Sequence, residues 1–170
     1  DSFYGSVTEV IKLINAIGTV NKDSGDKIKA AREAYDKLSE NDKKRVSNYK
    51  KLTDAEAAYE ALMNEDVRNV EKLIDAIGTV TLNSKDKIDA ARKAYDALPA
   101  AQKLKVSNYA KLTDAESKLA QLQKEEDKKT AKKVEDMIDA LSSNSSTFEE
   151  DVKAAKAAYD VLTPAQRKLV

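Results

Sequence analysis

The amino-acid sequence predicts an all-α protein made of tandem three-helix bundles, which continuous helices join into an elongated rod. Three observations predict this fold. Ala, Lys, Asp, Glu and Leu dominate the 170 residues, whereas glycine occurs four times and proline twice, a composition that favours helices. Residues 7–66 align with residues 67–126 without a gap, and 34 of these 60 positions are identical. Within each repeat, apolar residues recur at the i, i+3, i+4, i+7 spacing of a helix face.

The repeats divide the chain into four segments. We expect residues 1–6 to be an N-terminal lead-in, residues 7–66 to be the first repeat, and residues 67–130 to be the second repeat with a polar helical linker at its end. Residues 131–170 match residues 67–106 at 14 of 40 positions and form a third repeat. The third repeat is truncated and lacks its last helix, because it has no counterpart of residues 107–122.

Each repeat opens with a predicted first helix. Ser6 and Glu9 have the spacing of a capping box, with Gly5 just before them, so we place the start of the first copy there. Gly18 and Gly78 mark the ends of the first two copies, because glycine adopts the left-handed conformation of a helix C-cap without steric cost. The apolar positions of the three copies are Val10, Leu13, Ile14 and Ile17; Val70, Leu73, Ile74 and Ile77; and Val134, Met137, Ile138 and Leu141.

The predicted second helix of each repeat carries a recurring tyrosine. Ser24 and Ser84 are the expected N-caps of the first two copies, and Thr147 with Glu150 has the spacing of a capping box in the third. The apolar positions are Ile28, Ala31, Tyr35 and Leu38; Ile88, Ala91, Tyr95 and Leu98; and Val152, Ala155, Tyr159 and Leu162. The tyrosines are in phase with core positions, so we interpret them as half-buried packing residues. A ladder of sugar-stacking rings is the alternative.

The predicted third helix follows a short helical turn, which is clearest where Thr163 precedes Pro164 and Gln166 as N-cap, N1 and N3 residues. Thr53 with Glu56 has capping-box spacing before this helix, and Thr113 with Glu116 repeats it. The apolar positions are Leu52, Ala55, Tyr59 and Leu62, then Leu112, Ala115, Leu119 and Leu122.

Junctions between repeats contain no obvious helix breaker. From Asp54 to Ile77 there is no glycine or proline, so we expect the third helix of repeat one to continue into the first helix of repeat two. The second junction is polar from Gln123 to Lys133 apart from Ala131, as in a helix that bridges domains through solvent. A local break near Thr130 is the alternative there.

Composition excludes several classes of function. The chain has no cysteine and no histidine, so we expect no catalytic residues, no cofactor and no transition-metal site, and hence no enzyme. Thirty basic and thirty acidic residues give zero net charge, which predicts no nucleic-acid binding, and no apolar run is long enough for membrane insertion. The clusters at residues 125–127 and 149–151 lack the spacing of a calcium loop.

The recurring pattern V..LI.AIGTV, I.AAR.AYD.L and QK..VSNY..LT.AE resembles three-helix repeats of Gram-positive bacterial surface proteins, and most closely those of bacillus-type S-layer proteins. The resemblance covers residues 7–170. It implies an exported, extracellular parent protein in the cell wall or surface layer, whose signal peptide lies outside this sequence. The implied partners are other domains of that parent, with cell-wall polymer as a further candidate.

From these observations we expect a structural spacer or stalk that holds other domains away from the wall. The alternative is a binding module for a cell-wall glycan or a host protein. Tyr49 with Asn48, and Tyr109 with Asn108, are the candidate glycan contacts, although these side chains also suit the turn before a helix.

Two further expectations concern charge pairs and exposure. Arg32 with Asp36, and Arg92 with Asp96, have the i, i+4 spacing of ordinary exposed helix pairs. The truncated third repeat should expose a stripe made of Ile138, Val152 and Tyr159.

Overall fold

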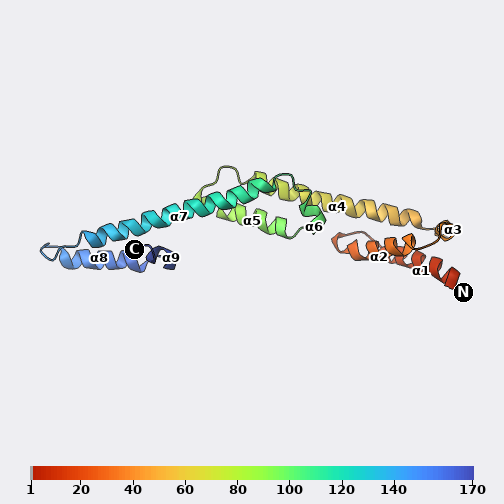
Figure 1. The fold of residues 1–170 in the computed structure, drawn as a ribbon, viewed down its shortest axis with the longest axis horizontal. Coiled ribbons are helices and arrows are strands. Elements are labelled where there is room, and N and C mark those ends of the chain that lie inside the picture. Colours follow the sequence, from red (N-terminus) through yellow and green to blue (C-terminus); the bar gives the residue numbers. More distant parts are fainter. Residues whose placement is uncertain (1) are drawn as a thin grey trace. The chain divides into compact units, whose positions relative to one another are not determined.

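The part of the chain that the computed structural model describes, which is residues 2–170 with side chains from residue 5 onward, consists of helices joined by short loops. No β-strand occurs in this part, as the composition predicts (Figure 1). Two 3₁₀ helices are present, η1 Lys22–Ser24 and η2 Leu82–Ser84. The α-helices are α1 Ser2–Ile17, α2 Gly25–Asp36, α3 Glu40–Lys43, α4 Tyr49–Asp75, α5 Lys85–Asp96, α6 Ala100–Lys103, α7 Tyr109–Asp139, α8 Phe148–Asp160 and α9 Pro164–Arg167.

The first helix starts earlier than predicted. α1 begins at Ser2 and runs through Gly5 and Ser6, so the expected capping box of Ser6 and Glu9 does not mark its start. A glycine inside a helix costs only about 1 kcal/mol relative to alanine. Burial of one valine or isoleucine contributes about 1.5–3 kcal/mol, and α1 buries several of them. The free energy gained by burying the apolar stripe of α1 therefore exceeds the cost of placing Gly5 inside the helix.

Gly18 and Gly78 adopt the left-handed conformation predicted for them. Their φ angles are +62° and +61°, and no other described residue has a positive φ. Each glycine follows the end of a first helix and turns the chain toward the next 3₁₀ helix, so the prediction of these two helix ends is confirmed.

Ser24 and Ser84 cap differently from the prediction. Each is the last residue of a 3₁₀ helix, and Ser24 makes no side-chain cap to the α-helix that follows it. Instead, the backbone N–H of Asn21 donates to the Ser24 hydroxyl at 2.9 Å, and the N–H of Thr81 donates to the Ser84 hydroxyl at 2.9 Å. The side chains of Asn21 and Thr81 are therefore the N-caps, one turn earlier than expected.

Backbone contacts divide the chain into two compact units, of which the first contains residues 1–72 and 94–107. Its described core lies between α1, α2 and the first half of α4. Ile14 and Leu52 are almost completely buried at its centre. The core cluster consists of Val7, Val10, Ile14, Ile17, Ile28, Ala31, Leu38, Val46, Leu52 and Ala55.

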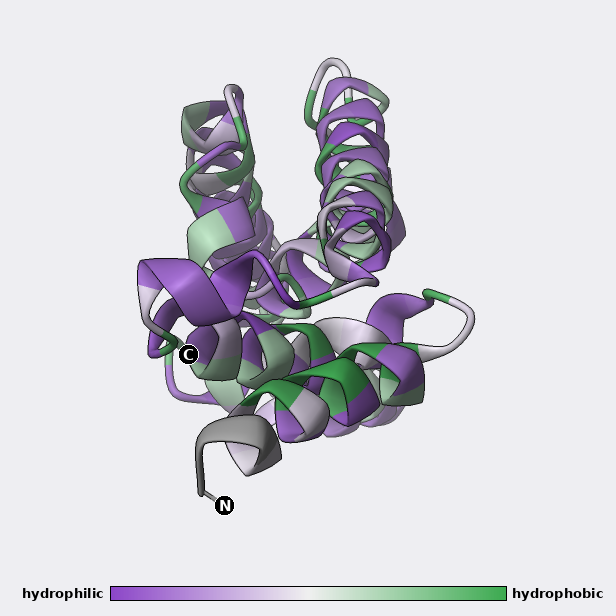
Figure 2. Cartoon of the chain, turned by 90° about the vertical axis from the view of Figure 1, so that its right-hand side faces the viewer, coloured by the Kyte–Doolittle hydropathy of each residue, from purple (hydrophilic) through white to green (hydrophobic). Residues whose placement is uncertain are grey.

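The second compact unit contains residues 73–93 and 108–170. Within it, α8 and α9 both pack against α7. Its buried apolar residues include Ile74, Ile77, Ile88, Ala91, Leu112, Ala115, Ala131, Val134, Ala155 and Leu162. Figure 2 shows hydrophobic and hydrophilic residues alternating along the helices, as expected where each helix buries one stripe.

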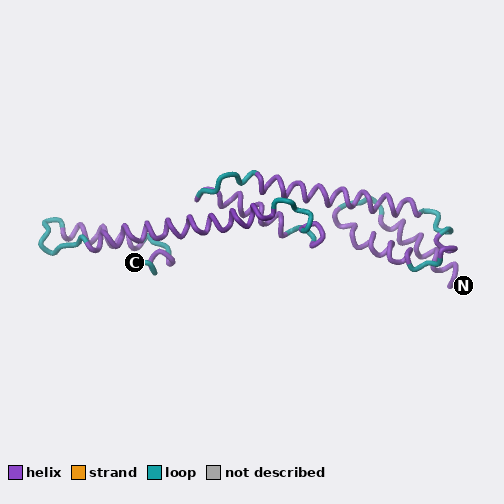
Figure 3. The backbone as a smooth tube through the Cα atoms, turned by 45° about the horizontal axis from the view of Figure 1, so that its top comes forward, coloured by secondary structure: helices purple, strands orange, loops and turns teal. Residues whose placement is uncertain are grey.

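Both junctions between repeats are helical. α4 is uninterrupted from Tyr49 to Asp75, and α7 from Tyr109 to Asp139 (Figure 3). The helix predicted through the first junction is confirmed. At the second junction, α7 passes through the polar stretch 123–133 without a break at Thr130. The expected continuous helix is therefore confirmed, and the alternative of a local break is wrong.

The third helices start four residues before the predicted caps. α4 begins at Tyr49, and the Thr53 hydroxyl inside it donates to the carbonyl of Lys50 at 3.0 Å. In α7, Thr113 makes the same bond to Ala110 at 3.0 Å. The capping boxes predicted from Thr53 and Thr113 are therefore wrong, because both threonines lie within a helix that has already begun.

The third repeat confirms one predicted cap and contradicts another. Thr163 and Gln166 form a reciprocal capping box with Pro164 in the first turn of α9, as predicted. Thr147 makes no side-chain cap to α8. Its hydroxyl donates instead to Asp151 at 3.0 Å, so the capping box predicted for Thr147 and Glu150 is wrong.

The third repeat also exposes most of the stripe that the sequence predicts. Ile138 is 40% exposed, whereas the aligned Ile14 and Ile74 are each 2% exposed. Val152 is 37% exposed and replaces two buried isoleucines. Tyr159 differs from the prediction and is half-buried, with the Arg167 guanidinium 5.3 Å from its ring centroid.

Candidate functional site

The first pair of candidate glycan contacts lies at the start of α4. The ring of Tyr49 stacks on Tyr35 with centroids 4.3 Å apart, and its hydroxyl accepts hydrogen bonds from the Arg32 guanidinium at 3.4 Å. The side-chain amide of Asn48 donates to the Ile11 carbonyl and to Asn15 Oδ1, both at 3.0 Å. Both side chains therefore join α4 to its neighbours in the same unit.

The second pair repeats this arrangement with one change. Tyr109 accepts from the Arg92 guanidinium at 3.4 Å. The amide of Asn108 donates at 2.9 Å to Asp75, which stands where the first repeat has Asn15. Contact of any of these four residues with a glycan stays a prediction, because their side chains have intramolecular roles that account for their recurrence.

An arginine–glutamate clasp joins the second and third helices of a repeat. Arg32 on α2 donates from Nη2 to Glu56 Oε1 at 2.6 Å and from Nε to Glu56 Oε2 at 3.0 Å. This is a bidentate, charge-assisted pair, which is stronger and more directional than a single contact. In the second repeat, Arg92 binds Glu116 in the same way at 2.6 and 2.8 Å.

The sequence prediction found only the weaker partner of Arg32. The predicted pair with Asp36 exists at 3.3 Å, and Asp36 is largely exposed. The capping-box spacing of Glu56 and Glu116 does not indicate that their carboxylates bind Arg32 and Arg92. The available signal was that an arginine and a glutamate recur together, at the same separation, in both complete repeats, whereas the third repeat has Lys156 in place of the arginine.

The surroundings of the Arg32 guanidinium favour its charged form. The hydrogen bond to Glu56 is the main cause that raises the pKa of Arg32 above its ordinary value, with smaller contributions from Tyr49 and Asp36. The guanidinium also lies 5.4 Å from the Tyr35 ring centroid and 5.3 Å from that of Tyr49. The clasp thus combines an ion pair with cation–π contacts, an arrangement that fixes two helices but leaves no group poised for proton transfer.

A cation lies over the recurring tyrosine of every repeat. Lys43 is 5.7 Å from the ring centroid of Tyr35, Lys103 is 5.7 Å from that of Tyr95, and Arg167 is 5.3 Å from that of Tyr159. The half-buried position of all three rings confirms their interpretation as packing residues.

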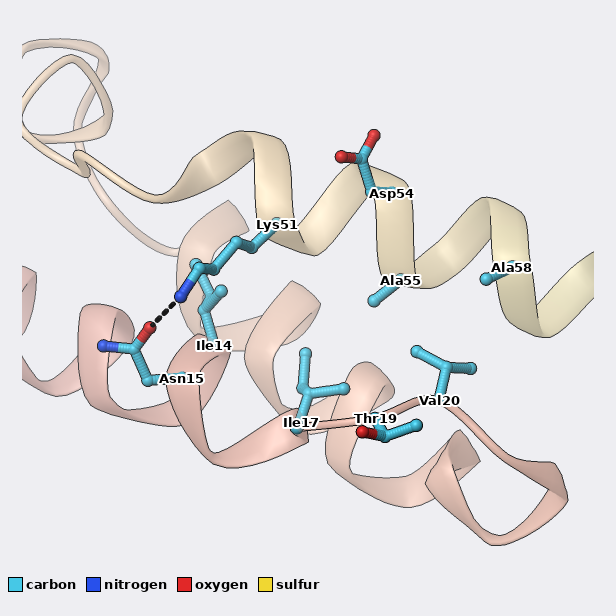
Figure 4. A pocket seen from close by; sticks show the side chains of 10 residues that line it. Ile14, Asn15, Ile17, Thr19, Val20, Lys51, Asp54, Ala55 and Ala58 are labelled. Carbon is cyan, nitrogen blue, oxygen red and sulfur yellow. Dashed lines mark hydrogen bonds between the residues drawn. The ribbon is translucent and has the colours of Figure 1, made fainter.

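A groove opens beside the helix end at Gly18, with a volume of about 660 Å³. Ile14, Ile17 and Ala55 form an apolar floor, and Figure 4 shows Lys51 reaching across to Asn15. Lys51 Nζ lies 3.2 Å from Asn15 Oδ1, and Asp54 stands on the same wall as Lys51. One positive and one negative side chain therefore border an apolar surface.

The same groove recurs beside Gly78, but it is smaller, with a volume of about 360 Å³. Lys118 borders it where the first groove has Ala58. Lys111 Nζ contacts Asp75 at 3.0 Å in place of the contact between Lys51 and Asn15. The two grooves thus share their apolar floor and differ in charge and volume.

The acidic clusters lie on helices rather than in loops. Residues 125–127 belong to the middle of α7, and residues 149–151 form the first turn of α8, where the helix dipole favours negative charge. Within the described residues, no three carboxylates come together as a metal site. A search of the same residues finds no helix that is both long and apolar enough to cross a membrane.

Comparison with protein-family models, with curated proteins and with solved structures gives no match for this chain. The recurring clasp, the recurring groove and the two helices that pass through the junctions are therefore the features on which a function can be based.

Proposed function

We propose that this chain is a structural spacer, built as a rod of tandem three-helix bundles within an exported bacterial surface protein. The observation that carries the proposal is that one helix serves two successive repeats. α4 provides the third helix of repeat one and the first helix of repeat two, and α7 does the same for repeats two and three. We expect a shared helix to couple neighbouring repeats, as nearest-neighbour interfaces do in other linear arrays.

Contacts within the first unit support this coupling. Lys105, in the turn of repeat two, lies 3.8 Å from Glu60 and 3.4 Å from Asn64, both on the α4 segment that belongs to repeat one. The Ser107 backbone N–H donates to Glu71 at 3.2 Å. A repeat of about 60 residues has only a small core of its own, so contacts of this kind add stability that grows with repeat number.

Small-angle X-ray scattering tests the spacer proposal. A rod should have a maximum dimension of roughly 60 to 90 Å, as the helix rise implies. A compact globule of 170 residues would have a radius of gyration of about 16 Å. A measured radius of gyration near that value would contradict the proposal. Attaching a fluorescent protein to each end and measuring energy transfer would show directly whether the chain holds two domains apart.

A second candidate function is a binding module for a cell-wall glycan or a host protein, which the recurring groove favours. Retention on purified cell-wall sacculi tests the glycan form. Ala58→Lys gives the first groove the residue that borders the second and smaller groove, so it should reduce retention without disturbing Tyr49. Tyr49→Ala should reduce retention further only if the ring itself contacts the glycan. Equal retention of all variants on the sacculi would exclude the groove as a glycan-binding site.

A further inference from the structure

We propose that Tyr35 and Tyr49 form an oxidative modification site, at which a one-electron oxidant supplied with peroxide joins the two rings by a dityrosine bond. Tyr35 lies near the end of α2 and Tyr49 at the start of α4, and both belong to the first compact unit. The bond links the second helix of repeat one to the third. Such a site is independent of the spacer function proposed above.

The two rings are already placed for coupling. Their centroids are 4.3 Å apart and their planes are inclined by 18°, a separation close to that of the two ring centres in a biaryl. A rotation of the rings out of the stack, with little movement of their centres, is therefore sufficient for a bond to form. Both side chains are half-buried, so a small oxidant reaches them while packing holds them together. Reacting groups held in this way have a high effective concentration.

Two cations border the stacked pair. The Arg32 guanidinium lies 5.4 Å from the ring centroid of Tyr35 and 5.3 Å from that of Tyr49, and Lys43 Nζ lies 5.7 Å from the ring centroid of Tyr35. Cation–π attraction of this kind helps to keep the rings in place. It does not oppose oxidation, because a tyrosyl radical is neutral once the phenol has lost a proton as well as an electron.

The hydroxyl group of Tyr35 is not needed for packing. Among the described residues, none makes a hydrogen bond with this hydroxyl, whereas the hydroxyl of Tyr49 accepts from Arg32 at 3.4 Å. A phenylalanine at position 35 would also stack on Tyr49 and attract the cations, but it could not form a phenoxyl radical. Arginine only donates hydrogen bonds, so Arg32 does not hold the phenol proton of Tyr49, which is free to leave.

The second repeat carries the same four side chains. Arg92 lies 5.3 Å from the ring centroid of Tyr109 and donates to its hydroxyl at 3.4 Å. Lys103 lies 5.7 Å from the ring centroid of Tyr95. We therefore expect a second cross-link, between Tyr95 and Tyr109.

The reaction balances with hydrogen peroxide as the final oxidant. Each phenol loses one electron and one proton, and together these break the O–O bond of one peroxide to give two water molecules. The two radicals then combine through a ring carbon next to each oxygen-bearing carbon, and the hydrogens of these two carbons move to the phenoxyl oxygens. One carbon–carbon bond forms, and the protein loses two hydrogen atoms.

Oxidation of the full chain with a haem peroxidase and hydrogen peroxide, followed by mass spectrometry of tryptic peptides, tests the proposal. We expect peptides that contain Tyr35 and Tyr49 to be joined within one chain, with a mass lower by two hydrogen atoms. Unfolding the chain in urea before oxidation should lower the yield at least about tenfold, because the rings are no longer held together. Cross-links between different chains only, or an equal yield from the unfolded chain, would overturn the proposal.

Two matched substitutions assign the site. Tyr35→Phe keeps a stacked ring and removes the group that is oxidised, so it should abolish this cross-link and leave that between Tyr95 and Tyr109 unchanged. Tyr59→Phe should leave both cross-links unchanged, because Tyr59 packs against Gly25. An unchanged circular dichroism spectrum of Tyr35→Phe would show that the loss is chemical and not a loss of fold. If Tyr35→Phe formed as much dityrosine as the unsubstituted chain, the assignment would be wrong.

Discussion

The hydroxyl oxygen of Tyr59 lies 2.6 Å from the point where a Cβ atom on Gly25 would stand, and the ring carbon that bears this hydroxyl lies 3.0 Å from that point. Tyr59 on α4 thus covers the first turn of α2. In the second repeat both members of the pair differ, because Lys85 replaces the glycine and Leu119 replaces the tyrosine. We therefore expect the residue types at the two positions to be coupled through side-chain volume.

Gly25→Ala should lower the free energy of unfolding of the chain by about 1–2 kcal/mol, because Tyr59 must move away from its packed position. In a Tyr59→Leu background the same substitution should be neutral or slightly stabilising, since alanine favours a helix more than glycine does. Urea unfolding of the four variants of the cycle measures the coupling.

The second repeat provides the control for this cycle. Lys85→Ala should change stability by less than about 0.5 kcal/mol, because Lys85 is exposed and its ion pair with Asp89 is exposed as well. Additive effects of Gly25→Ala and Tyr59→Leu would show that the two residues do not compete for space.

The clasp should contribute measurably to the stability of the first repeat. Glu56→Gln should destabilise this repeat by about 1 kcal/mol, because it removes a bidentate charged acceptor from a guanidinium that is only 27% exposed. Arg32→Lys should have a similar effect, because an ammonium cannot bind both carboxylate oxygens in the same geometry. Thermal unfolding monitored by circular dichroism measures both changes.

Asp36→Asn is the matched control, because it removes the exposed partner of the same arginine. Exposed i, i+4 pairs contribute about 0.3–0.5 kcal/mol, so this loss should be clearly smaller than that of Glu56→Gln. If the two losses were equal, the bidentate geometry would have no energetic consequence.

Periodicity predicted most of the fold, because the apolar stripe determines which residues are buried. Val10, Ile14, Ile28 and Leu52 are all core residues, as their spacing indicates. Gly18 and Gly78 were predictable because no other residue type adopts a positive φ as readily. Local polar motifs predicted helix caps less reliably, because a serine or threonine near a helix start matches the spacing of more than one kind of cap.

The clasp shows why long-range polar pairs are harder to predict. Glu56 has the spacing of a capping box with Thr53, and nothing in the local sequence indicates that its carboxylate faces Arg32. Only the docking of α2 against α4 brings the two groups to 2.6 Å. Tyr49 is similar, since its stacking on Tyr35 depends on packing between helices that a turn signal does not encode.

Asp75 should give the second repeat a response to acid that the first repeat lacks. Hydrogen bonds from Asn108 and then Lys111 lower the pKa of Asp75 below its ordinary value of 3.8. A lowered pKa means that its stabilising contribution is complete above the ordinary value and is lost as the pH falls through the lowered pKa. NMR titration of the Asp75 carboxyl carbon measures the shift directly.

Repeat one supplies the comparison, because Asn15 occupies the aligned position and does not titrate. Asp75→Asn should therefore remove this part of the acid response and slightly lower stability at neutral pH, where the contribution is complete; the loss should be small, since Asp75 is largely exposed. A carboxyl that titrates at or above its ordinary pKa would contradict the contact with Asn108.

The polar stretch of α7 provides a test of helix continuity. Spin labels at positions 118 and 133 should give one narrow distance distribution centred at about 22 Å, as the rise of an unbroken helix implies. Lys129→Pro should broaden this distribution, because proline removes one backbone hydrogen bond and clashes with the preceding turn, at a cost of about 3 kcal/mol. Few side chains of this stretch are buried, so packing should not restore the helix. Lys129→Ala should leave the distribution narrow, and a broad distribution in the unsubstituted chain would contradict an unbroken α7.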